Sequence, residues 1–165
     1  MSVLVSNDAG LDSLMPEQDV VRIVEGVLAE EGVTRPVEIS VSFVDEAEMR
    51  ALNGEWRGID APTDVLSFEC DSAFDDSIPA DEVIELGDII LAPEVIARQA
   101  PGFGNEPAGE LALMLVHGTL HLLGYDHIDE DEAEVMESRE DELLELLGQT
   151  GVEVGPTVNH AHDGD

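Results

Sequence analysis

The sequence predicts an α+β protein in which helices pack on a single mixed β-sheet of about four strands. Three observations predict this class. Residues 37–43 alternate apolar and polar side chains, as a strand with one buried face does. Residues 20–28 carry apolar side chains at helical spacing, and residues 108–123 form a mostly apolar helix. The order of elements combines one crossover unit with a hairpin-like pair of strands, which favours a mixed sheet.

Four elements are expected before residue 64. They are a strand at 3–5, a helix from Pro16 to a stop at Gly32, the strand at 37–43, and a short helix from Asp45 through Leu52. Proline suits a first helical turn, where its missing N–H costs no hydrogen bond. Asp45 followed three residues later by Glu48 matches a capping box. Residues 56–63, which include Arg57, are predicted to form a loop.

The second half predicts six further segments. They are a strand at 64–68, an exposed acidic loop at 69–85, a strand at 86–92, and helices at 93–99, 108–123 and 129–147. The helix at 108–123 is apolar on most sides, so we expect it to be buried, with Gly124 ending it. Residues 1–147 then form one domain. Residues 148–165 are rich in glycine and polar groups and predict a disordered tail, with His160 and His162 in solvent.

The charge of the 165 residues is unusual, because 39 Asp+Glu against 6 Lys+Arg give a formal net charge of −33. This excludes a basic nucleic-acid-binding face of the usual kind. No apolar run is long enough to span a membrane, and no secretory signal opens the chain. With one cysteine, Cys70, no internal disulfide forms, so the expected location is the cytoplasm. The acidity fits either simple solubility or adaptation to high salt.

The most informative segment reads His-Gly-Thr-Leu-His-Leu-Leu-Gly-Tyr-Asp-His from His117 to His127. His117 and His121 lie one turn apart on one helical face, and Gly124 lets the chain reverse so that His127 returns as a third ligand. Three unsatisfied buried imidazoles would be costly, so a shared metal ion explains them better than core packing. Three protein ligands with one open position are typical of catalytic zinc, although nickel and copper also suit imidazole.

The same spacing occurs in H-E-x-x-H-x-x-G-x-x-H metallopeptidases, with one difference. Gly118 stands where those enzymes carry the glutamate that serves as general base. The pattern therefore predicts a three-histidine metal site strongly and peptide hydrolysis weakly. Asp126 is a candidate for a carboxylate that orients a ligand histidine, but it fits a turn equally well, and we favour the turn.

The eleven residues resemble H-G-x-L-H-L-x-G-Y-D-H, the signature of the YbeY family of bacterial endoribonucleases. Further blocks resemble that family in the same order: Leu52-Asn53, Trp56-Arg57, Pro62 to Phe68, and Leu86 to Ile89. The resemblance spans residues 3–147. It implies a single-strand-specific, metal-dependent endoribonuclease that matures the 3′ end of 16S rRNA and acts in quality control of 70S ribosomes.

The resemblance also implies roles for four residues. It implies one zinc ion on His117, His121 and His127, and it matches the family's arginine to Arg57. A guanidinium can hold a scissile phosphate through two parallel hydrogen bonds, although Arg57 could instead form an ion pair in so acidic a protein. The expected partners are single-stranded RNA from the 16S 3′ region and the ribosome or its small-subunit proteins.

Two other functions stay open at this point. One is a metal-dependent peptidase or other hydrolase. The other is a non-enzymatic ribosome-assembly factor with a structural three-histidine site.

Overall fold

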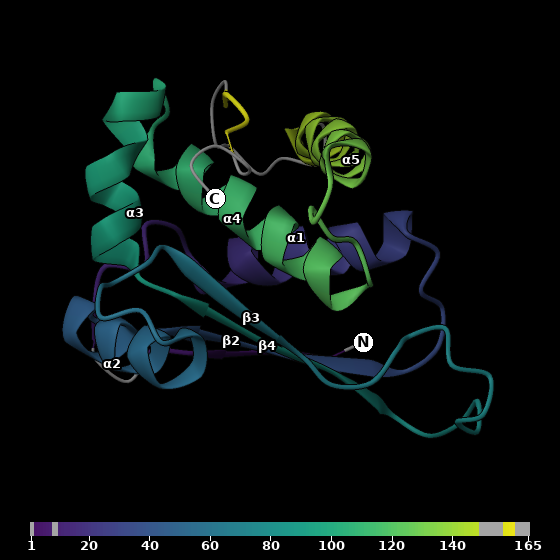
Figure 1. Ribbon diagram of the computed structural model, residues 1–165. Helices are drawn as coiled ribbons and strands as arrows, with labels where there is room; N and C mark the ends of the chain where they lie inside the picture. Colours follow the sequence, from purple (N-terminus) through teal and green to yellow (C-terminus); the bar gives the residue numbers. More distant parts are fainter. Residues whose placement is uncertain (1, 8–9, 149–156, 161–165) are drawn as a thin grey trace.

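The computed structural model describes residues 2–7, 10–148 and 157–160. Its elements, in chain order, are β1 (Ser2–Ser6), α1 (Glu17–Glu30), β2 (Val37–Phe43), α2 (Glu46–Arg57), β3 (Val65–Glu69), β4 (Ile84–Leu91), α3 (Pro93–Gln99), the 3-10 helix η1 (Ala100–Phe103), α4 (Pro107–Leu122) and α5 (Glu130–Gly148). Figure 1 shows α1, α4 and α5 gathered over one side of the sheet, with α2 at its lower left end.

The four strands form one sheet in the order β1-β2-β4-β3. β1, β2 and β4 are parallel neighbours, whereas β3 pairs with β4 in the antiparallel sense. The predicted mixed sheet, with one crossover through α1 and one antiparallel pair, is therefore confirmed. Gly87 on β4 has φ of 139°, and a Cβ there would lie 1.9 Å from the Phe68 carbonyl oxygen, so only glycine fits between these strands.

Helix α4 is the centre of the fold. Thirteen of its 16 residues are buried, as its apolar composition predicted. It packs against α1, α3 and α5 as well as β3 and β4, so it is covered on almost every side. Polar side chains on α4 are consequently held inside the protein, where each needs a partner.

Helix α2 covers part of the opposite face of the sheet, where Met49 and Leu52 pack against Leu66, Phe68 and Ile90. The predicted cap at its start is confirmed, because Asp45 Oδ1 accepts a hydrogen bond of 2.8 Å from the Glu48 N–H. The prediction that a loop begins at residue 56 is wrong. The helix continues through Trp56 and Arg57 and ends at Gly58, whose φ is 70°.

The long connection between β3 and β4 is largely exposed, as expected, but Ala73 is buried in the core and Arg35 binds its backbone. The Arg35 guanidinium donates to the carbonyl oxygens of Asp75, Ile78 and Pro79 at 3.3, 3.2 and 2.7 Å. In the described part of the chain, no helix is long and apolar enough to cross a membrane.

Candidate metal centre and active-site cavity

The three predicted histidines converge at the end of α4. His117 and His121 lie on its last turns, and His127 follows the reversal at Gly124, where φ is 104°. One ring nitrogen from each histidine can be chosen so that all three lie within 4.8 Å of one another. The Nε2 atoms of His117 and His121 are 3.1 Å apart. Three neutral imidazoles at this spacing suit one divalent transition metal such as zinc.

A carboxylate from α5 orients the first of these rings. His117 Nδ1 donates to Glu140 Oε2 at 2.6 Å, and both side chains are buried. This bond occupies Nδ1 and leaves Nε2 directed at the other histidines, an arrangement that fixes the tautomer in metal sites. Asp126 has the role we favoured, since its Oδ1 accepts from the His127 N–H at 2.8 Å within the turn.

Glu140 was not among the site residues predicted from the sequence, although its position in α5 carries a signal. The buried residues of α5 are Met136, Glu140, Leu143 and Leu147, which follow helical spacing. Glu140 thus stands on the apolar stripe of an otherwise acidic helix, where an unpaired carboxylate would be costly. An acid at such a position indicates a buried partner on a neighbouring element.

The electrostatic environment keeps His121 neutral. Burial is the main cause that lowers its pKa to about 4, and the neighbouring His117 and His127 lower it further. The neutral imidazole is the form that binds a metal ion. His121 therefore needs to release no proton on metal binding at neutral pH.

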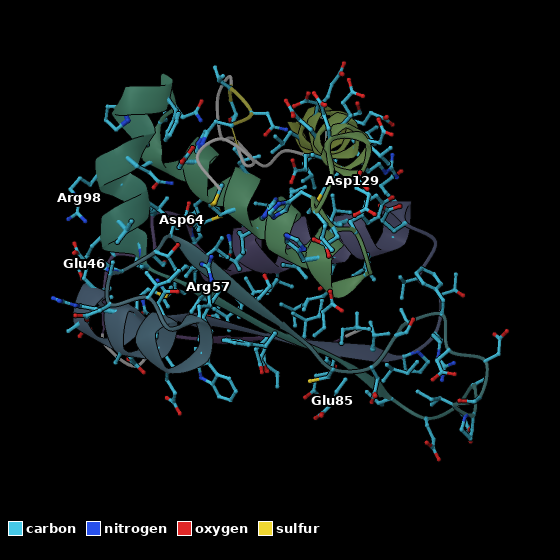
Figure 2. The ribbon with its side chains drawn as sticks, in the orientation of Figure 1. Glu46, Arg57, Asp64, Glu85, Arg98 and Asp129 are labelled. Carbon is cyan, nitrogen blue, oxygen red and sulfur yellow. The ribbon has the colours of Figure 1, made fainter. Side chains whose placement is uncertain are left out.

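The histidines line a cavity of about 440 Å³ that also includes Arg57, Asp64, Ser67, Gln99 and Phe103. Figure 2 labels Arg57 between the end of α2 and the helix α4. Within the described residues, the other five arginines have a hydrogen-bond or ion-pair partner, whereas Arg57 has none. Its guanidinium is exposed and available to an anionic ligand.

Gly118 lies where α4 contacts the sheet, beside Ser67, which also lines the cavity. A Cβ at that position would lie 3.0 Å from Ile89 Cγ2 and 3.1 Å from Ser67 Oγ. A side chain at 118 would therefore require Ile89 or Ser67 to shift. With glycine at this position, the chain lacks the side chain that serves as general base in H-E-x-x-H metallopeptidases.

A second buried carboxylate, Glu110, lies farther along α4 and binds His160. Glu110 Oε1 accepts from Asn105 Nδ2 at 2.9 Å and from His160 Nε2 at 2.5 Å, while Gln99 Nε2 donates to Oε2 at 2.7 Å. His160 is only 7% exposed and lines the cavity. The interpretation of His160 as a solvated residue is therefore wrong, because it satisfies a buried carboxylate. His162 lies outside the described residues.

The fold and the site define a class: an α+β protein with a three-histidine metal-binding motif at the end of a buried helix. Residues 5–148 match the Endoribonuclease YbeY family, so the chain belongs to this family and the resemblance seen in the motif is confirmed. An Endoribonuclease YbeY of Caldanaerobacter subterraneus is 42% identical over 155 residues, covering 90% of this chain and 98% of that protein.

Two further comparisons agree. An Endoribonuclease YbeY of Micrococcus luteus is 40% identical over 159 residues, covering 96% of this chain and 99% of its own. The solution structure of TM1509 from Thermotoga maritima superposes with a TM-score of 0.58 at 22% identity, over 95% of this chain and 99% of that one. The last likeness concerns the fold alone.

Proposed function

We propose that this protein is a zinc-dependent endoribonuclease that cleaves phosphodiester bonds of single-stranded RNA. The observation that carries the proposal is the cavity in which the unpartnered Arg57 and the three converging histidines meet. Its relatives are named endoribonucleases, and the alignments cover nearly their full length. The geometry of the cavity supports metal-dependent chemistry, and the names of the relatives support RNA as the substrate.

In this proposal His117, His121 and His127 hold one zinc ion. The donor set fits zinc, because all three groups are imidazoles and the oxygen-rich ligand sets of magnesium or calcium are absent from this cluster. When bound, zinc supplies a Lewis acid that polarises a phosphoryl oxygen and lowers the pKa of water. Glu140 holds the His117 ring so that Nε2 faces the metal position.

Arg57 has the role of binding the scissile phosphate. Its guanidinium carries a permanent positive charge and has five donors in a planar fork, which matches two phosphate oxygens. The lack of a carboxylate partner among the described residues leaves these donors available. The availability of Arg57 matters because the chain has a net charge of −33, so few other cations are present to bind a phosphate.

We extend the proposal to the biological substrate. Membership of the family supports action at the 3′ end of 16S rRNA and in ribosome quality control, in the cytoplasm, with small-subunit proteins as partners. A basic partner surface would also offset the repulsion between the acidic chain and RNA.

The two other functions are less well supported. Peptide hydrolysis by the H-E-x-x-H mechanism lacks its general base, because Gly118 stands at the position of that glutamate. A purely structural metal site is normally closed by four protein ligands, whereas three histidines here border an open cavity.

The test is cleavage of an end-labelled single-stranded RNA that carries the 16S 3′-end sequence. Wild-type protein is assayed with and without a chelator, beside His121→Ala prepared identically. We expect cleavage that is lost with either treatment. Cleavage that survives the substitution would reveal a contaminating nuclease. A metal-loaded protein that cuts no RNA but co-sediments with small ribosomal subunits would favour the assembly-factor function instead.

A further inference from the structure

At one end of the cavity, the rings of Phe103 and His160 stack face to face. Their centroids are 3.4 Å apart, and their planes differ by 2°. Phe103 is 36% exposed, lines the cavity and belongs to neither apolar core cluster of the described residues. Core packing therefore does not account for this aromatic side chain.

The stack is held in place by buried polar groups. His160 donates to Glu110, a carboxylate that is fully buried on α4. Val158, two residues before His160, forms two hydrogen bonds with the Asn105 side chain. Its carbonyl oxygen accepts from Asn105 Nδ2 at 3.0 Å, and its N–H donates to Asn105 Oδ1 at 2.6 Å. Asn159 Nδ2 donates to Glu140 Oε1 at 3.2 Å. Asn159 and His160 are thus held by the two buried carboxylates Glu140 and Glu110, and Val158 is held by Asn105.

The stack and the three histidines line the same cavity, so a single ligand can contact both. Glu110 precedes His117 by seven residues on one helix, which is roughly 10 Å at 1.5 Å per residue.

We propose that Phe103, backed by His160, forms a nucleobase-stacking subsite for single-stranded RNA in this cavity. The inference rests on the proposed endoribonuclease function and adds a binding site to it. Proteins that bind single strands commonly stack bases on aromatic rings, and this contact tolerates any sequence. Phe103 contacts the base, while His160 is a positioning residue that holds the Phe103 ring. Stacking also suits an acidic protein, because it does not depend on cationic side chains and salt does not screen it.

The test uses single-stranded RNA oligonucleotides with 2-aminopurine placed at successive positions, because stacking quenches its fluorescence. We expect strong quenching at one position with wild-type protein and its loss with Phe103→Leu. The same variant should raise KM about 5- to 150-fold, the effect of losing one stacked base, while kcat stays unchanged. Phe74→Leu is the matched control, since Phe74 is 55% exposed and does not line the cavity.

His160→Gln separates the two partners of the stack. Glutamine keeps a donor for Glu110 but removes the ring, so we expect partial loss of quenching and a smaller rise in KM than Phe103→Leu causes. An abasic nucleotide at the quenched position should reproduce the rise in KM with wild-type protein. This measurement remains valid even if a Phe103 variant fails to fold.

The outcomes separate this subsite from the proposed function. RNA cleavage without position-specific quenching, or an abasic substrate with unchanged KM, would overturn the subsite and leave the endoribonuclease intact. Position-specific quenching that Phe103→Leu abolishes, in a protein that cleaves no RNA, would support the subsite and overturn the cleavage function.

Discussion

Beyond the three histidines themselves, Glu140 makes a direct contact to the candidate metal centre. Its carboxylate fixes the His117 ring at 2.6 Å, and comparable outer partners of metal ligands change affinity by about 10- to 100-fold. We expect Glu140→Gln to weaken zinc binding by that factor in a competition titration with a chromophoric chelator. Glu145→Gln, an exposed change on the same helix, is the control. Equal affinities for the two variants would show that the contact does not matter.

Substitution of Arg57 should lower catalytic activity without lowering stability. It is exposed and has no partner within the described residues, so its removal should leave the melting temperature unchanged. Loss of a charged hydrogen bond to phosphate costs about 1.5–3 kcal/mol. We therefore expect Arg57→Ala to lower kcat/KM for RNA by about 10- to 150-fold, with Arg57→Lys only partly active. Unchanged kcat/KM in Arg57→Ala would refute the phosphate role.

The site residues that could be predicted are those whose role depends only on nearby sequence. His117, His121 and His127 are linked by one helical turn and one glycine reversal, so their spacing alone predicts the cluster. Glu140 and His160 depend on how distant elements pack on α4. Composition placed His160 in a solvated tail, because polar composition does not reveal a buried partner.

At the scale of elements, the contact between α4 and the sheet controls the position of the histidines. A Cβ on Gly118 would press on Ile89 Cγ2 at 3.0 Å and Ser67 Oγ at 3.1 Å. We expect Gly118→Ala to destabilise the protein in urea unfolding, because an overpacking cost of about 1–3 kcal/mol outweighs the gain of up to about 1 kcal/mol in helix propensity.

Gly54→Ala is the matched control and should have the opposite sign. Gly54 lies inside α2, where a Cβ would meet only the Ile59 carbonyl oxygen at 3.7 Å. Alanine is the better helix former, so this change should stabilise the protein by up to about 1 kcal/mol. A stabilising Gly118→Ala would contradict the close packing of α4 on β4.

Most element types were predictable because each segment carries its own periodicity, whereas the 3-10 helix η1, the start of β4 at Ile84 and the end of α2 were not. The end of α2 was placed before Trp56, since Gly58 and Pro62 marked the segment as a loop. The structure shows that Gly58 ends the helix in the left-handed conformation, so Arg57 is carried on its last turn. A glycine can terminate a helix as well as interrupt one, and sequence alone does not distinguish the two.

For the whole molecule, the net charge of −33 predicts an unusual dependence on salt. Salt usually weakens RNA binding, because it screens attraction to basic groups. Here it screens repulsion, both within the chain and between chain and RNA, and the screening length falls from about 10 Å at 0.1 M to about 3 Å at 1 M. We expect potassium chloride over this range to raise the free energy of unfolding and to maintain or increase RNA cleavage. A steep fall of activity with salt would refute this.

The most direct test of the central claim is metal reconstitution. Protein stripped of metal is titrated with zinc, and bound zinc and RNA cleavage are measured on the same samples, beside His121→Ala. We predict that cleavage by the wild-type chain rises in proportion to bound zinc and levels off at one ion per chain, while His121→Ala neither retains zinc nor cleaves. Cleavage that is independent of zinc occupancy, or that is equal in His121→Ala, would contradict the assignment of the chemistry to the three histidines.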